Sequence, residues 1–289
     1  RPAGRPAGPR RTPVTGTVAG SRTSPPPLLR WAPLVLAGAL VLTAISYPLT
    51  DGAGRNAVSW TIVLLGAGVS VLSAVAGRGW RTGLGVLVLV PVAAVLIEAL
   101  GLATGFPYGE YSYSGVLGAT LLGVPFLVPL AWLMMAWPSW VLADLLTARV
   151  RPGRRTVARV LVATYLFAAW DVVLDPQLVQ AGYWRWAHPS PGLPGIGTVP
   201  LTNLAGWLLA GLLLMAVLDR LVARTARPPG LRNADAAPLL VLGWMTLGGA
   251  VAHAGWLDLP GSAAWGAVLA LPVLGALARV LRSRGAGAR

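Results

Sequence analysis

Long apolar runs, separated by short polar or basic segments, make up the chain from residue 31 onward. An α-helix needs about 20 apolar residues to cross the ~30 Å hydrocarbon core of a bilayer, and most runs have close to that length. They lie near residues 31–49, 57–76, 83–103, 116–147, 157–179, 201–222, 237–253 and 262–281. We therefore predict an all-α fold, a polytopic transmembrane helix bundle of about eight spans over residues 31–281.

The fourth run, residues 116–147, is too long for a single straight span. It contains Pro125, Pro129 and Pro138, and proline removes a backbone donor and kinks a helix. We expect this run to be kinked or to begin with a re-entrant piece.

The two ends of the chain have a different composition from the apolar runs. Residues 1–30 are rich in Pro, Gly, Arg, Ser and Thr and have almost nothing to bury, so they are predicted to form a disordered cytoplasmic arm. No cleavage site of small residues follows the first apolar run, so we do not expect a signal peptide. Residues 282–289 are predicted to form a basic cytoplasmic tail.

Composition supports a membrane protein. Of the 289 residues, 55% are hydrophobic, and the mean hydropathy of +0.67 is too high for a soluble domain. There is no cysteine, so disulfides, thiolate nucleophiles and zinc–thiolate sites are excluded. All 23 basic residues are arginine, which is typical of a GC-rich bacterial genome.

The positions of the arginines indicate an orientation. All of them except Arg55 and Arg185 fall in the arm, in the tail or at span ends on one side of the predicted bundle. Because arginine is retained on the cytoplasmic side, we expect a multi-pass protein of the cell membrane with both termini cytoplasmic. Because the arginines flank spans, the net charge of +14 favours membrane lipid headgroups as partners. We expect no nucleic-acid partner.

Two acidic residues lie at cytoplasmic ends of the predicted spans. Asp144 is close in sequence to Arg149, and Asp219 is next to Arg220. We expect both to form interfacial ion pairs with these arginines.

Three other carboxylates lie within the apolar runs themselves. A carboxylate inside a span usually faces a cavity or a partner. Glu98, Asp171 and Asp175 all fall in the outer half of the bilayer on the predicted orientation, so they can converge. Asp171 and Asp175 share a helix face, and two carboxylates this close are expected to share a proton, as a general acid requires. A structural alternative is that the pair binds Arg185 or caps a helix that breaks before Pro176.

Tyrosine and tryptophan gather in the two outer segments beside these carboxylates, residues 105–113 and 182–207. A membrane-interface belt explains most tryptophans but not this concentration. Glu110 could join the carboxylates or be a solvated loop residue. The two histidines, His188 and His253, are expected to be structural, and no metal site is predicted.

The combination of these residues resembles the membrane carotenoid-biosynthesis family, the family of carotenoid 1,2-hydratases and bisanhydrobacterioruberin hydratases. The resemblance covers residues 80–215, and Leu204 stands where the family pattern has an aromatic residue. It is carried by Glu98, Gly101, Gly105, Tyr108-Gly109, Tyr111, Tyr113, Gly123-Val124-Pro125, Pro129, Trp132, Asp171-x-x-x-Asp175-Pro176, Gly182, Trp184, Trp186, Pro200, Asn203, Gly206 and Trp207.

The resemblance implies a hydratase (a lyase) that adds water across the terminal C1,2 double bond of a linear carotenoid ψ end group, without a cofactor. One of Asp171 and Asp175 would protonate the alkene, and the other carboxylate or Glu98 would deprotonate water. Expected partners are a carotenoid or other isoprenoid lipid and other membrane enzymes of the carotenoid pathway. The predicted substrate-binding residues are Tyr108, Glu110, Tyr111, Tyr113, Trp132, Trp184, Trp186, Asn203 and Trp207.

Two other functions fit the same residues. A transporter or proton-coupled carrier of a small solute could use the carboxylates as a proton relay, but it also predicts a polar path through the inner half. Another isoprenoid-lipid-modifying enzyme, such as a prenyl or glycosyl transferase, usually needs acid-rich motifs that hold a metal and a diphosphate.

Overall fold

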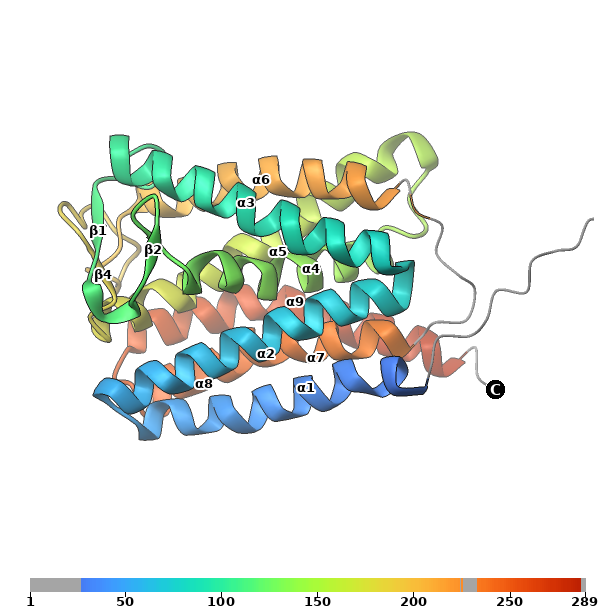
Figure 1. Cartoon of the computed structure of the whole chain (residues 1–289), viewed down its shortest axis with the longest axis horizontal. Helices are drawn as coiled ribbons and strands as arrows, with labels where there is room; N and C mark the ends of the chain where they lie inside the picture. The colour runs from blue at the N-terminus through green and yellow to red at the C-terminus, as the bar shows by residue number, and fades with distance from the viewer. Residues whose placement is uncertain (1–26, 224, 226–232, 287–289) are drawn as a thin grey trace, which may run out of the picture.

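Helices form almost all of the structure, a computed structural model that describes residues 27–223, 225 and 233–286 (Figure 1). Within these residues, eight helices are long and apolar enough to cross a membrane, which confirms the predicted all-α bundle. Residues 1–26 of the predicted arm and 287–289 of the predicted tail lie outside the described residues.

The spanning helices follow one another along the chain, and two long connections, residues 105–126 and 181–200, contain the strands. The first six are α1 (Pro27–Ser46), α2 (Gly52–Arg78), α3 (Trp80–Thr104), α4 (Leu127–Leu146), α5 (Pro152–Gln180) and α6 (Leu201–Ala223). The seventh span joins α7 (Ala236–Gly243), a π-helical turn (Trp244–Gly248) and α8 (Gly249–Gly255), and the eighth is α9 (Pro260–Ala286). Short 3₁₀ helices lie at Tyr47–Leu49, Gly115–Leu117 and Asn233–Asp235.

The predicted start of the fourth span is wrong, because α4 begins only at Leu127. The residues before it form the 3₁₀ turn Gly115–Leu117 and a hairpin of β2 (Thr120–Leu121) and β3 (Val124–Pro125). Gly118, which ends the 3₁₀ turn, and Gly123, which lies in the turn between β2 and β3, both have a positive φ angle of 82°. The run is therefore a capping loop followed by one span, and Pro138 lies inside that span.

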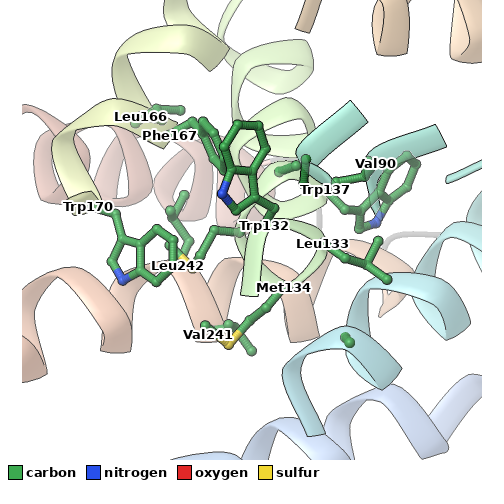
Figure 2. Packing of buried hydrophobic residues seen from close by; sticks show 14 of the residues in the cluster. Val90, Trp132, Leu133, Met134, Trp137, Leu166, Phe167, Trp170, Val241 and Leu242 are labelled. Atoms are coloured by element: carbon green, nitrogen blue, oxygen red, sulfur yellow. The ribbon is translucent and has the colours of Figure 1, made fainter. Parts of the chain in front are cut away.

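Helix α4 is the centre of the bundle, with α2, α3, α5 and α7 packed around it. Most of its side chains are buried, and they are apolar on every face, as expected for an enclosed helix. Figure 2 shows Trp132, Met134 and Trp137 of α4 among Phe167 of α5 and other apolar side chains.

Figure 1 shows two different ends of the bundle. Strands β1 (Tyr111–Tyr113) and β4 (Trp184–Trp186) lie at one end, which we call the ribbon end. Helix α1 begins and α9 ends at the opposite end, which we call the basic end.

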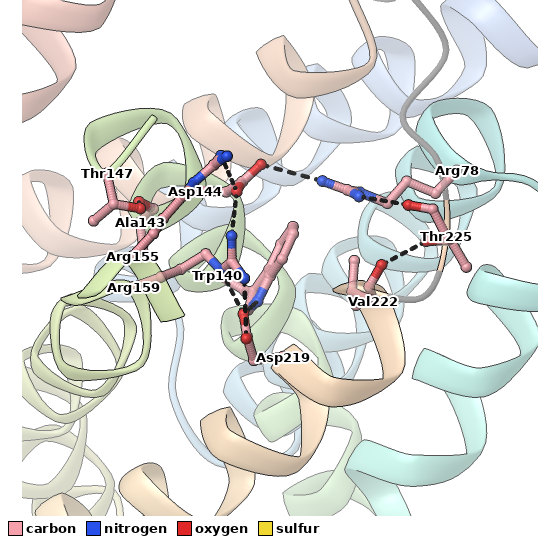
Figure 3. A network of polar contacts seen from close by, with 10 residues as sticks. All are labelled: Arg78, Trp140, Ala143, Asp144, Thr147, Arg155, Arg159, Asp219, Val222 and Thr225. Carbon is pink, nitrogen blue, oxygen red and sulfur yellow. Dashed lines mark hydrogen bonds and ion pairs between the residues drawn. The ribbon is translucent and has the colours of Figure 1, made fainter. Parts of the chain in front are cut away.

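A buried network of charged side chains ties four helices together at the basic end (Figure 3). Asp144 of α4 accepts hydrogen bonds from Arg78 of α2 at 3.1 Å and from Arg155 and Arg159 of α5 at 3.0 and 2.9 Å. Arg159 also forms a two-point ion pair with Asp219 of α6. Asp144 and Asp219 therefore do form ion pairs, but the prediction of Arg149 and Arg220 as partners was wrong.

Both carboxylates of this network lie in the interior of the protein. Asp219 is 1% exposed and Asp144 6% exposed, and the indole of Trp140 donates to Asp219 at 3.0 Å. The guanidinium groups of Arg78 and Arg159 lie 4.7 and 5.4 Å from the centre of the Trp140 ring. Helix packing selects these partners, because α2, α5 and α6 converge on α4 here.

Candidate active site

Strands β1 and β4 form an antiparallel ribbon, with Tyr111 opposite Trp186 and Tyr113 opposite Trp184. Side chains alternate along a strand, so these four aromatic residues share one face. Arg185 lies on the other face and is exposed. We predicted only loops here, although the alternations Tyr-Ser-Tyr and Trp-Arg-Trp carry the period of two that is typical of strands.

The ribbon supplies hydrogen-bond donors to Glu98, which lies near the end of α3 and is 4% exposed. Its Oε2 atom accepts from the hydroxyls of Tyr111 at 2.5 Å and Tyr113 at 2.9 Å. Burial, followed by the charge of Glu98, raises the pKa of both tyrosines well above the ordinary value. Both hydroxyls therefore keep their protons at neutral pH and remain donors.

Asp171 and Asp175 are both buried on one face of α5, and one amide binds both. Asn203, in the first turn of α6, donates to Oδ2 of Asp171 at 2.9 Å and to Oδ2 of Asp175 at 2.5 Å. The two carboxyl groups also interact directly, and both are within electrostatic range of Glu98. The three carboxylates that the sequence singled out therefore converge.

The structural alternative for the aspartate pair is wrong. Arg185 is on the exposed face of the ribbon and forms no ion pair with either aspartate. Helix α5 also continues past Pro176 to Gln180, so the aspartates do not cap a broken helix.

Two glycines allow Tyr108 to pack between α3 and α6. A Cβ atom on Gly206 would lie 2.5 Å from the Tyr108 ring and 2.9 Å from the carbonyl oxygen of Pro107. A Cβ atom on Gly101 would lie 3.0 Å from the same ring. Gly101 and Gly206 therefore let the Tyr108 ring approach the backbones of α3 and α6 closely.

A cavity of about 840 Å³ adjoins these residues. Glu98 and Asp175 line it directly, whereas Asp171 lies behind them beside a separate small void. The aromatic wall of the 840 Å³ cavity includes Trp132 and Trp207, whose ring centres are 5.1 Å apart. The predicted binding residues that line the cavity are Tyr108, Tyr111, Tyr113, Trp132, Trp184, Trp186, Asn203 and Trp207.

Glu110 is the one predicted binding residue that does not line the cavity. Its side chain is exposed, and its backbone carbonyl accepts a hydrogen bond from Ala187 at 2.9 Å. Of the two readings that the sequence left open, the geometry agrees with the solvated loop residue.

Comparison with known proteins identifies the family of this chain. The family model described as "Carotenoid biosynthesis protein" matches residues 58–272, which include Glu98, the aspartate pair and Asn203. The chain belongs to this family. A curated relative, the bisanhydrobacterioruberin hydratase of Haloarcula japonica, is 35% identical over 162 residues. That alignment covers 54% of this chain and 53% of the relative, so the chain spans about half the length of that protein. No solved structure matches the chain.

The site of this carotenoid biosynthesis protein includes a second polar group that sequence reasoning missed. Gln177, which lines the cavity, contacts Nε2 of His253 at 3.0 Å, and Nδ1 of His253 contacts the hydroxyl of Ser262 at 2.8 Å. Ser59 and Tyr183, also in the lining, share a hydrogen bond of 3.1 Å. Gln177 stands out only as an uncharged polar residue in an apolar span, and this signal is weaker than that of a carboxylate.

Some buried polar atoms of the lining make no hydrogen bond within the described part of the chain. They are the hydroxyls of Tyr47 and Tyr108 and the indole nitrogen of Trp132. Buried polar groups normally have partners, so these atoms are suited to meet a polar atom of a ligand or a water molecule. Among the described residues, no three His, Cys, Asp or Glu side chains are grouped as metal ligands would be.

Proposed function

We propose that this carotenoid biosynthesis protein is a hydratase that adds water to the terminal C1,2 double bond of a linear carotenoid. The observation that carries the proposal is that Glu98 and Asp175 face one apolar, aromatic-walled cavity inside the helix bundle. The name of the Haloarcula japonica relative, a hydratase, supports the same reaction class.

Asp175 is the proposed acid, because it lines the cavity and Asp171 does not. Its proton is transferred to the less substituted carbon of the double bond, the π electrons form the new C–H bond, and a tertiary carbocation remains. Asp171 is a positioning residue. Two adjacent carboxyl groups share a proton more readily than both ionise in a low dielectric, and Asn203 holds the pair together.

Glu98 is the proposed base. A water molecule adds through its oxygen to the cationic carbon, and Glu98 accepts the proton that this water loses. Return of that proton to Asp175 completes the cycle, so the net change is one water added to one double bond. Tyr111 and Tyr113 keep the Glu98 carboxylate in place through their hydroxyls.

The aromatic wall has a defined part in this mechanism. Indole and phenol ring faces attract a nearby cation by about 0.5–2 kcal/mol each when water is excluded. Trp132, Trp184 and Trp207 line the cavity around the two carboxylates. They are suited to stabilise the carbocation between protonation and the arrival of water.

Substitution of the aspartates tests the proposal. We expect Asp175→Asn to lower hydration by about 10²–10⁴-fold, the usual contribution of a general acid, because the amide cannot donate a proton to an alkene. Asp171→Asn should lose activity as well, but less, because Asp171 acts only through Asp175. The measurement is hydrated pigment per unit of membrane-inserted protein, in a host that accumulates lycopene or γ-carotene.

The control is Asp51→Asn, which changes an exposed aspartate outside the cavity lining. It should keep wild-type activity. Near wild-type specific activity in both Asp171→Asn and Asp175→Asn would remove the pair from the mechanism. Lower abundance with normal activity per molecule would indicate a structural role instead.

The cavity also bears on the transporter alternative. Toward the basic end its lining is apolar and includes Ala236, Leu239, Leu240 and Leu277. Asp144 and Asp219, which lie at that end, are held in ion pairs. A proton or polar solute would find no polar route along this lining, so the geometry favours an enzyme.

Chelation distinguishes the proposed hydratase from a diphosphate-dependent transferase. Protonation and hydration of an alkene need no metal, nucleotide or flavin in the mechanism above. We expect hydration to persist in membranes treated with a chelator. Loss of activity that a divalent ion restores would favour the transferase instead.

A further inference from the structure

We infer that the part of the cavity along the seventh span binds the apolar chain of the substrate, as a rod roughly parallel to that span. This inference rests on the proposed function, because it assigns a place to the rest of a molecule whose end group reacts at Asp175. The cavity lining begins at Ala236, the first residue of α7, and reaches Trp256, just after α8.

The lining positions on this span form one continuous stripe. Nine of them recur at intervals of three and four residues, which places these nine on a single helix face. The nine are Ala236, Leu239, Leu240, Gly243, Trp244, Leu247, Gly248, Val251 and Ala252, and Met245 and Gly249 widen the stripe at the π-helical turn. The stripe runs from Ala236 to Ala252, so at 1.5 Å per residue it extends for about 24 Å. The groove therefore covers most of the ~30 Å thickness of a bilayer core.

The distribution of polarity along the groove gives it a direction. Glu98 and Asp175 are the only charged residues in the described lining, and both lie toward the ribbon end. Toward the basic end, Leu274 and Leu277 of α9 face α7 across the groove. A ligand that fits both parts is a long apolar rod with its reactive end at the ribbon end.

The groove also communicates with lipid along one side. Ile45 of α1 and Leu240 and Val251 of the seventh span line it, yet they are 49%, 43% and 52% exposed. In a bilayer such exposed apolar side chains contact lipid tails. A hydrophobic substrate can therefore enter sideways from the membrane.

Blocking the groove far from the carboxylates tests the inference. Leu240→Trp and Ala236→Phe both add bulk near the basic end. We expect each to reduce kcat/KM for a carotenoid with the ψ end group by about tenfold or more, because the added side chain occupies the space that binds the apolar chain of the substrate. A short acyclic isoprenoid that ends in the same alkene does not reach this region, and its kcat/KM should change by less than about twofold.

The matched control is Leu271→Trp on α9, which is 67% exposed and outside the lining. It should leave both substrates unaffected. Unchanged carotenoid activity in both groove variants would overturn the inference. So would an equal loss for both substrates at normal abundance, because the groove would then have no relation to chain length.

A binding measurement separates this inference from the proposed function. Wild-type protein purified in mild detergent should retain lycopene, measured as bound pigment per protein, whereas Leu240→Trp should retain about tenfold less. If the wild type binds lycopene at the groove but hydrates nothing, the proposed reaction fails and the binding site stands. If the groove variant retains as much pigment as the wild type, the binding site fails.

Discussion

Buried carboxylates are expensive in a membrane-spanning helix unless donors surround them, and hydrogen bonding reduces this penalty. Glu98 has two tyrosine hydroxyls, and the aspartate pair has the amide of Asn203. Oδ1 of Asp171 is buried and has no hydrogen-bond partner in the described residues. The site therefore keeps an unsatisfied polar atom beside Asp175, the proposed acid, which is consistent with function more than with stability.

Gly206→Ala is the most direct test of how the site is packed. The added Cβ would overlap the Tyr108 ring and approach the carbonyl oxygen of Pro107, so we expect destabilisation by about 1–3 kcal/mol, the usual range for overpacking. The readout is the midpoint of thermal unfolding in detergent, together with hydration activity.

Gly275→Ala is the matched control, since a Cβ there meets nothing within 4 Å. Alanine is the better helix former by about 1 kcal/mol, so this variant should be neutral or slightly more stable. Equal stability of the two variants would contradict the packing argument for Gly206.

At the scale of elements, the two ends of the bundle are held by different forces. A two-stranded ribbon is marginally stable alone, and β1–β4 depends on the helices beneath it. The indole of Trp186 donates to the carbonyl oxygen of Tyr108 at 3.1 Å, and Thr202 of α6 donates to the same atom at 3.3 Å. At the basic end, ion pairs among α2, α4, α5 and α6 hold the helices together.

Arg159→Met should destabilise the bundle strongly. It leaves Asp219 without its ion-pair partner in a buried site, and breaking a buried pair in this way costs about 3–5 kcal/mol. We expect a lower midpoint of thermal unfolding and lower abundance in the membrane.

Two further variants make the test of Arg159 specific. Arg154→Met removes an exposed arginine of the same helix and should have little effect. Combining Arg159→Met with Asp219→Asn removes the uncompensated charge and should recover part of the loss. A wild-type unfolding midpoint in Arg159→Met would show that the network does not stabilise the fold.

For the whole molecule, the uneven distribution of arginines predicts which end of the bundle faces the cytoplasm, and the helix packing alone does not. Reporter fusions after residues 80, 152 and 228 should report the cytoplasm, and fusions after residues 53, 110 and 190 the outside. On this predicted orientation, the ribbon end and the candidate site lie on the outer side of the membrane. Two or more reversed reporters would contradict the arrangement.

The sequence alone determined the properties that depend on local composition. Run length and hydropathy gave the bundle and most span boundaries, because a bilayer requires about 20 apolar residues per helix whatever their neighbours are. Isolated carboxylates in those runs gave Glu98, Asp171 and Asp175, because their burial is costly in any fold. The motif residues also gave the family, which the match over residues 58–272 confirms.

Only the tertiary structure decided which side chains meet and which way they face. Arg159 is paired with Asp219 from another helix, 60 residues away in sequence, and no local pattern specifies that contact. The same applies to Asp175 lining the cavity while Asp171 lies behind it, since both share one helix face. Such distinctions depend on how α3, α5 and α6 pack, and side-chain contacts between helices are set by shape and not by spacing along one chain.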